Sequence, residues 1–262
     1  MPNAKSSFTL DRVPLDLTFR IVTLAARELL APDYVRIRLQ GADLAGFSSL
    51  GADDHMRLFF PASGTTEADM RALDTEELRA FPSREYTPLA WGDDWLDVEF
   101  ALHSGAGVAS TWAASAAIGS AIGVGGPRGS AVVSGTPDAW LLVGDETAIP
   151  AIRRFAAMIP DATPARIAIE VASAADHVDI DAPVAVEWLH RGENPAGSAV
   201  CSFLDSLAET DRLSNDPFCF IAAEQQVVKP GRALLARWGV DTAKATVKGY
   251  WKRGEDEYHA PH

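Results

Sequence analysis

Short apolar segments separated by glycine, proline and aspartate dominate the first half of the chain. Strands are expected at residues 20–24, 34–39, 56–60 and 95–102. In the second of these, Val35, Ile37 and Leu39 alternate with polar residues, which is typical of a strand with one face in a core. The fourth alternates in the same way and places Asp97 and Glu99 on its polar face. Several short alternating strands predict an antiparallel barrel or sandwich.

Two helical signals interrupt this half. The polar interval 61–83 is expected to be a surface excursion between two barrel strands, with a short helix within 66–79. An alanine-rich stretch at 109–118 predicts a second helix.

The pattern changes after Pro137, where the apolar runs lose their alternation. Buried strands are expected at 140–143, 166–171, 184–189 and 218–222, with 246–251 closing the sheet, and helical spacing predicts helices at 147–159, 201–208 and 225–238. Strands that alternate with helices predict a parallel sheet covered on both faces. The sequence therefore predicts an N-terminal antiparallel β-barrel domain at 1–136 and a C-terminal α/β domain at 137–262.

Composition and charge limit the possible partners. The chain has 262 residues, of which 47% are hydrophobic, so it can form a substantial core. Its net charge of −13 argues against nucleic-acid or anionic-membrane binding, because basic groups supply most of that affinity. The residues from Lys229 onward are instead net basic, so this tail either serves a small anion or is a solvated face.

Cysteine, histidine and targeting signals point to a cytoplasmic protein. Cys201 and Cys219 lie in apolar stretches and are expected to be buried thiols in a reducing compartment. No signal peptide is visible, and no apolar run reaches the roughly 18 residues of a membrane span. Six scattered histidines lack metal-site spacing, so no protein-held metal is expected; His55, His177 and His190 are interpreted as structural or surface residues.

The first candidate binding segment is Arg84-Glu85-Tyr86-Thr87. Arg84 and Tyr86 should share one face of a strand, where a guanidinium could hold a phosphate beside an aromatic plane. A barrel strand with an exposed arginine and a core tyrosine fits the spacing at least as well.

The second candidate runs from His103 to Ala113, where a strand ends, glycines follow and a helix begins. Free N–H groups at a helix N-terminus favour a phosphate, and Ser110 and Thr111 could add hydroxyl donors. A glycine-rich turn that caps an ordinary helix is an equal alternative.

Two further turns carry charged residues. After the strand at 140–143, Asp145 and Glu146 would repel a pyrophosphate and complement the helix dipole, with Thr147 as a possible cap, so this turn favours a neutral ring. The turn Gly126-Pro127-Arg128-Gly129-Ser130 carries one arginine, and a solvated side chain is its simpler interpretation.

Taken together, these motifs resemble the siderophore-interacting protein family. They occur in the order Arg-x-Tyr-Thr, His…Gly-x-x-Ser-x-Trp-Ala, Gly-Pro-Arg-Gly-Ser, Gly-Asp-Glu-Thr-Ala, Trp-Leu-His-Arg and Gly-Tyr-Trp-Lys-Arg-Gly, between about residues 20 and 254. The resemblance implies a ferredoxin-reductase-like fold with FAD in the barrel and a nicotinamide nucleotide on the α/β domain. Leu89 stands where the family usually has arginine, and Ser104, Val108 and Ala223 also depart from its pattern.

The resemblance also assigns site residues. It implies that Arg84 binds the FAD pyrophosphate and that Tyr86 and Thr87 bind its ring and ribityl chain. Further FAD contacts are implied for His103, Gly105, Gly107, Ala109, Ser110, Thr111 and Trp112. The nicotinamide side is implied at Gly144, Asp145, Glu146 and Thr147. Ala223 and Glu224 correspond to the family's Ala-Gly-Glu segment and are implied to bind cofactor. By charge and position, Arg128, Lys248, Lys252 and Arg253 are the candidates for siderophore or phosphate contact.

The implied activity is that of a monomeric ferric-siderophore reductase. Electrons would pass from NADPH or NADH through FAD to Fe(III), and Fe(II) would be released; no catalytic side chain is expected, because the cofactor carries the chemistry. A general NAD(P)H–flavin or ferredoxin-type reductase is one alternative. A non-catalytic siderophore- or flavin-binding protein is another.

Overall fold

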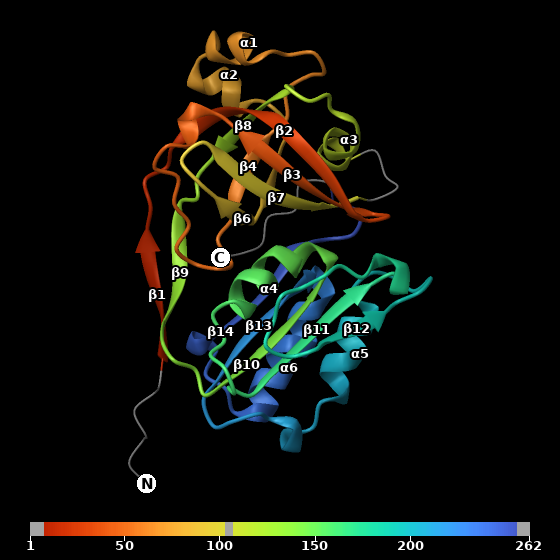
Figure 1. Ribbon diagram of the computed structural model, residues 1–262. Coiled ribbons are helices and arrows are strands. Elements are labelled where there is room, and N and C mark those ends of the chain that lie inside the picture. Colours follow the sequence, from red (N-terminus) through yellow and green to blue (C-terminus); the bar gives the residue numbers. More distant parts are fainter. Residues whose placement is uncertain (1–7, 103–106, 256–262) are drawn as a thin grey trace. The chain divides into compact units, whose positions relative to one another are not determined.

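The computed structural model describes residues 8–102 and 107–255 and divides along the chain into two units (Figure 1). The barrel unit is Arg12–Ala131, and the parallel-sheet unit joins Met1–Asp11 to Val132–His262. Figure 1 shows an antiparallel sheet in the first unit and a sheet with helices in the second. The assignment of separate cofactors to residues 1–136 and 137–262 stays a prediction.

Seven antiparallel strands form the sheet of the barrel unit, in the order β5-β4-β8-β2-β3-β7-β6. Their bounds are β2 (Phe19–Ala31), β3 (Tyr34–Gln40), β4 (Met56–Phe59), β5 (Ser83–Tyr86), β6 (Pro88–Trp91), β7 (Trp95–Ala101) and β8 (Ala121–Gly125). The edge strands β5 and β6 are separated along the chain by Thr87 alone. Because one residue spans only about 3.6 Å, the sheet must curl until its two edges meet at Thr87. This curl confirms the predicted antiparallel barrel.

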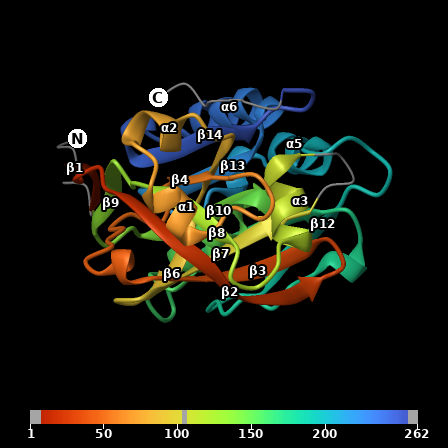
Figure 2. The same cartoon turned by 90° about the horizontal axis from the view of Figure 1, so that it is seen from above.

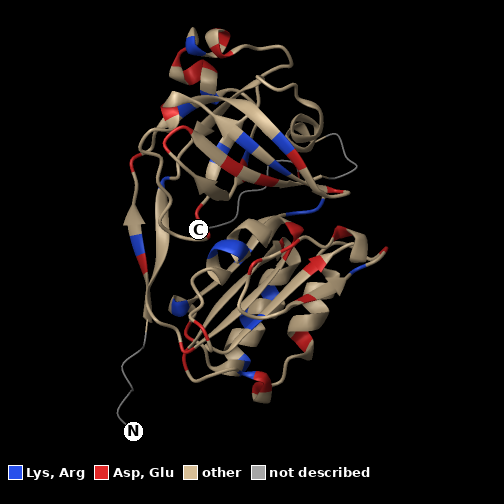
Figure 3. Cartoon of the chain, in the orientation of Figure 1, with Lys and Arg blue, Asp and Glu red and all other residues tan. Residues whose placement is uncertain are grey.

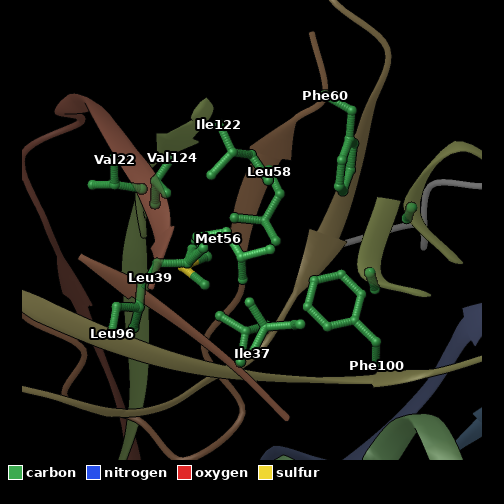
Figure 4. Close-up of a cluster of buried hydrophobic side chains, with 14 of the residues drawn as sticks. Val22, Ile37, Leu39, Met56, Leu58, Phe60, Leu96, Phe100, Ile122 and Val124 are labelled. Atoms are coloured by element: carbon green, nitrogen blue, oxygen red, sulfur yellow. The ribbon is translucent and has the colours of Figure 1, made fainter. Parts of the chain in front are cut away.

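The core of the barrel unit follows from the alternation in its strands. Val35, Ile37 and Leu39 are buried together with Leu96, Val98 and Phe100 and with the inward residues of β4 and β8 (Figure 4). Asp97 and Glu99, on the opposite face of β7, are also buried. They pair with Arg38 and Arg36 at 2.7 Å each, and Figure 3 shows basic and acidic bands facing each other on β3 and β7.

Three helices accompany this sheet, namely α1 (Glu67–Arg71), α2 (Thr75–Arg79) and α3 (Val108–Ser115). The first two lie between β4 and β5, so the predicted excursion is confirmed, although it forms two short helices rather than one. Each begins with a capping box, at Thr66 and at Asp74. Arg27 of β2 caps the C-terminal end of α3 by donating 2.6 Å hydrogen bonds to the carbonyl oxygens of Ala113 and Ala116.

The parallel-sheet unit contains five parallel strands in the order β12-β11-β10-β13-β14. Their bounds are β10 (Ala139–Asp145), β11 (Ala165–Val171), β12 (Val186–His190), β13 (Pro217–Glu224) and β14 (Ala245–Trp251). The helices are α4 (Ile149–Ala156), α5 (Ser198–Ser206) and α6 (Val228–Trp238), with short 3₁₀ turns that include η2 (Glu146–Ala148), η3 (Ala174–Asp176) and η5 (Gln225–Val227). The predicted parallel sheet is therefore confirmed.

Both faces of this sheet are covered. Phe155 of α4 packs against Trp140, Phe218 and Phe220 on one face. Helices α5 and α6 lie side by side on the other face, over a cluster that includes Leu141 (Figure 2). Strands β10 and β13 are buried along their whole length, which explains their unbroken apolar sequences.

Two strands that the sequence did not reveal form a separate pair, β1 (Phe8–Pro14) with β9 (Gly129–Gly135). The prediction of two buried thiols holds for Cys219 but is wrong for Cys201, which is half-buried because it lies at the border of the buried face of α5. Among the described residues, no helix is long and apolar enough to cross a membrane.

Candidate functional site

The strand β5 presents Arg84 and Tyr86 on the inner face of the barrel sheet. Its register with β4 places Tyr86 opposite Met56 and Arg84 opposite Leu58, and these two partners are core residues. Glu85 points the other way and accepts a 3.0 Å hydrogen bond from Arg57. The predicted common face of Arg84 and Tyr86 is therefore confirmed, and it is the inner one.

Packing on the inner face of the sheet holds the ring of Tyr86 in place. The ring of Tyr86 lies against Phe100, with centroids 4.2 Å apart, and burial raises the pKa of its hydroxyl above the usual range. Thr87, where the sheet edges meet, is also buried. The guanidinium of Arg84 is half-buried and donates a 2.8 Å bond to the carbonyl oxygen of Ser83. A rigid aromatic residue thus lies beside a cation on the same face.

Helix α3 contacts β5 and β7, so the second candidate segment lies next to the first. Its N-cap is the exposed Gly107, where an added Cβ would meet no atom of the described residues within 4 Å, and its first turn holds no acidic residue. Ala109 is buried, Ser110 is half-buried and Thr111 is exposed. Trp112 packs against Phe60, with ring centroids 5.8 Å apart. His103 and Gly105 lie outside the described residues.

These observations fit a flavin nucleotide. The half-buried Arg84 and, among the described residues, the open space at Gly107 and the lack of a side-chain cap or an acid in the first turn of α3 suit a phosphate-bearing ligand. The hydroxyl groups of Ser110 and Thr111 are neutral donors in the same turn. The donor set is therefore compatible with FAD in this unit.

The turn around Arg128 is held by hydrogen bonds to the buried carboxylate of Asp54. Ser130 donates a 2.5 Å bond to Asp54, which also accepts bonds from Ser49 and from the backbone N–H of Gly51. Arg128 itself is exposed. Ser130 therefore has a structural role, and the side chain of Arg128 is open to solvent.

In the other unit, Asp145 ties together three strands at the C-terminal edge of the parallel sheet. One carboxylate oxygen accepts bonds from the backbone N–H and the hydroxyl of Thr147, at 3.0 and 2.5 Å. The other accepts from the N–H of Glu224 on β13 and from Nε1 of Trp251 on β14, both at 2.9 Å. Asp145 is thus the N-cap of this turn. The prediction that Thr147 is the cap is wrong, because the side chain of Asp145 accepts the hydrogen bond from the backbone N–H of Thr147.

Three strand-end acids occupy the nearby helix N-termini. Asp145 caps η2, Glu170 accepts bonds from the N–H groups of Gly197 and Val200 at the start of α5, and Glu224 accepts one from Gln226 at the start of η5. These carboxylates occupy the places where a pyrophosphate would otherwise bind. That the turn after β10 disfavours a phosphate stays a prediction.

An arginine compensates part of this acidic cluster. Arg191 binds Glu146 through two bonds of 2.8 and 2.9 Å and lies 3.7 Å from Glu170. Burial raises the pKa of Asp145 to about 6, with Glu146 adding to the effect, and burial also raises the pKa of Glu146 and of Glu170. The cluster therefore holds protons at higher pH than exposed carboxylates do.

The remaining predicted residues lie close to this edge. Gly144 precedes Asp145 in β10, where an added Cβ would come within 2.7 Å of the carbonyl oxygen of Ala222, and Ala223 is buried in β13. The backbone N–H of Arg253 donates a 3.2 Å bond to Glu224.

The three basic tail residues differ in exposure and pairing. Lys248 is half-buried on β14, opposite Ala222 of β13. Lys252 forms an ion pair with Glu255, so part of its charge is compensated. The side chain of Arg253 is exposed. Of these three residues, Arg253 is thus the most open to an anion.

Sequence reasoning missed Glu170, Arg191 and Trp251 as members of this network. Arg191 and Trp251 belong to two of the motifs that carried the family resemblance, and Glu170 is an acid near the end of an apolar strand. The acidic residue near the end of each inner strand was the signal in the sequence that could have indicated the network. That these acids lie close together depends on the order of the strands in the sheet.

Comparison with known proteins gives a consistent result over nearly the whole chain. The family described as "Siderophore-interacting FAD-binding domain" matches residues 23–131, and "Siderophore-interacting protein" matches residues 137–254. An NADPH-dependent ferric-chelate reductase of Escherichia coli is 33% identical, covering 92% of this chain and 95% of that protein. The ferric vibriobactin reductase ViuB of Vibrio cholerae is 27% identical, with 92% of each chain covered.

Solved structures agree. A siderophore utilization protein from T. fusca superposes with a TM-score of 0.81 and 28% identity, covering 95% of this chain and 97% of that one. A ferredoxin reductase of carbazole 1,9a-dioxygenase gives 0.65 at 17% identity, covering 90% and 69%, which confirms the ferredoxin-reductase-like fold. On its sequence, its fold and the ordered motifs along both units, the chain belongs to the siderophore-interacting protein family.

Proposed function

We propose that this protein is an oxidoreductase that reduces the Fe(III) of a ferric siderophore with electrons from NADPH or NADH, passed through FAD, and so releases Fe(II). The observation that carries the proposal is the near full-length similarity to an NADPH-dependent ferric-chelate reductase, together with the family's FAD-binding domain at 23–131. The relationship to ferric vibriobactin reductase supports a siderophore as the chelate.

In this proposal FAD is held by the inner face of β5 and the start of α3. Arg84 binds a phosphate, Tyr86 and Thr87 bind the ring and ribityl chain, and Ser110 and Thr111 donate to the pyrophosphate. Bound FAD supplies the redox chemistry, since a flavin accepts a hydride and can pass on single electrons. The contact of Tyr86 with Phe100 keeps its ring in one orientation, so the protein's part is to bind and orient.

The nicotinamide nucleotide is proposed to bind at the C-terminal edge of the parallel sheet, where ligands of such sheets are usually found. Because Asp145, Glu170 and Glu224 already cap the helices there, its phosphates need other partners. The exposed Arg253 and the half-buried Lys248 are the proposed partners for these phosphates or for an anionic siderophore. Arg128 and Lys252 are proposed for the siderophore by charge alone.

The first experiment is a visible spectrum of the purified protein before and after anaerobic NADPH or NADH, followed by addition of a ferric siderophore. We expect flavin absorbance that the nucleotide bleaches and the siderophore restores. A protein that is colourless and binds no added FAD would overturn the proposal.

Arg84→Ala tests the FAD site directly. It should lower FAD occupancy while the fold stays intact, because a cation on the inner face is lost. Arg57→Ala is the matched control, since Arg57 lies on the outer face of the neighbouring strand and pairs with Glu85. Equal flavin content in both variants would argue against the assignment.

Substrate tests separate the alternatives. A general flavin or ferredoxin-type reductase would turn over free flavin or ferredoxin without any siderophore-dependent oxidation of NAD(P)H. A non-catalytic binding protein would keep its flavin oxidised under anaerobic NAD(P)H. We also propose a cytoplasmic monomer, and the elution volume in size-exclusion chromatography tests the monomer.

A further inference from the structure

Two histidines from separate segments meet end to end at the rim of the parallel-sheet unit. His177 follows the turn η3, and His190 is the last residue of β12, paired in register with Val171 of β11. Their Nε2 atoms are 2.7 Å apart, whereas the ring centres are 5.0 Å apart with an interplanar angle of 24°. The two Nε2 atoms therefore lie between the two rings and face each other.

An indole ring holds one of the pair in place. Trp188, two residues before His190 on β12, lies parallel to His177 with ring centroids 4.4 Å apart and an interplanar angle of 15°. His190 is exposed and His177 is half-buried, so water and small ions can reach the pair. Trp188 restricts His177 while His190 stays free to adjust.

The contact requires one Nε2 to carry a proton and the other to offer its lone pair. If the proton of the donor ring moves to its own Nδ1, both Nε2 lone pairs become available, and two neutral rings lose no proton overall. Two Zn–N bonds of about 2.0–2.1 Å at a tetrahedral angle separate the nitrogens by about 3.4 Å. The two Nε2 atoms would have to move apart by about 0.7 Å, and the rings would have to turn until both lone pairs point to the ion. Most of this movement falls to the exposed His190 side chain.

We propose that His177 and His190 form a two-imidazole site for a divalent first-row transition-metal ion. Imidazole nitrogen suits Zn²⁺, Cu²⁺, Ni²⁺ and Fe²⁺, and Cu²⁺ should bind most tightly of these. Among residues 8–102 and 107–255, no group of three His, Cys, Asp or Glu side chains is arranged to hold a metal, so water or a chelating ligand completes the coordination. The site is independent of the proposed reductase activity.

The test is titration of the FAD-saturated full chain with Zn²⁺ and with Cu²⁺, by calorimetry and by tryptophan fluorescence. Loss even of an outer-shell partner lowers metal affinity about 10–100-fold, so His177→Gln and His190→Gln should each lower it by about tenfold or more. His55→Gln is the matched control, because His55 is a partly exposed histidine outside the pair, and it should leave this affinity unchanged.

A tryptophan variant gives a second readout. Cu²⁺ bound at His177 lies beside Trp188 and should quench its fluorescence, so Trp188→Phe should lose that part of the quenching while keeping most of the calorimetric affinity. Identical isotherms for wild type, His177→Gln and His190→Gln would overturn the proposal. Unchanged quenching in Trp188→Phe would place the ion elsewhere and would also overturn it.

Discussion

Replacing Asp145 with asparagine tests the buried carboxylate that joins β10, β13 and β14. Its pKa is raised from 3.8 to about 6 in the folded state, mainly by burial. The folded state therefore keeps the proton to higher pH than the unfolded state, and the free energy of unfolding falls as pH rises from about 4 to about 6, then levels off. The shift of about two units corresponds to about 3 kcal/mol over that whole range.

Asp145→Asn removes this titration. Relative to the variant, the wild type should lose about 1 kcal/mol of unfolding free energy between pH 5 and pH 7.5. The amide also turns an NH₂ group toward donors such as the indole N–H of Trp251, a cost of about 1–3 kcal/mol that does not depend on pH. The two effects are separable because only the first changes with pH.

The assay is urea unfolding of the FAD-saturated protein at pH 5, 6, 6.5 and 7.5, followed by fluorescence and circular dichroism. Asp205→Asn is the control, since Asp205 is an exposed carboxylate on α5 of the same unit, and its stability should run parallel to the wild type. If the difference between wild type and Asp145→Asn stays constant across pH, the reasoning about the buried charge is refuted.

Three further stability changes follow from the contacts described. Arg191→Ala leaves the mostly buried Glu146 without its cation and should destabilise the protein by about 3 kcal/mol in urea unfolding, with partial recovery on adding Glu146→Gln. Ser130→Ala removes a donor from the buried Asp54 and should lower the free energy of unfolding by about 1–3 kcal/mol; no loss would mean that water replaces it. Arg27→Met uncaps α3 and should cost about 1 kcal/mol, measured in the same way.

The strands of the parallel sheet were predictable because burial on both faces leaves unbroken apolar runs. Strand β10 is buried at every residue, and the sequence there is apolar up to Gly144. Strand β2 was predicted only at 20–24, although it continues to Ala31, because exposed Glu28 and Leu29 and its irregular register with β3 break the alternation. Strand β9 is rich in small residues and carries little signal.

The candidate sites divide in the same way. A local rule, that residues two apart on a strand share a face, was enough for Arg84 and Tyr86. The part played by Asp145 was not predictable, because its partners Glu224 and Trp251 are 79 and 106 residues away. Only the order of the strands in the sheet brings them to one edge.

The pairing of β1 with β9 has a consequence for how the chain is made. The barrel unit is one continuous stretch that begins at Arg12 and ends at Ala131, on two neighbouring strands. It is therefore an insertion into the other unit, whose Phe8 is synthesised long before Phe218, the residue that it packs against with ring centroids 6.1 Å apart. During synthesis the barrel can fold first, whereas the parallel sheet cannot be completed until its last strand, β14, has been synthesised.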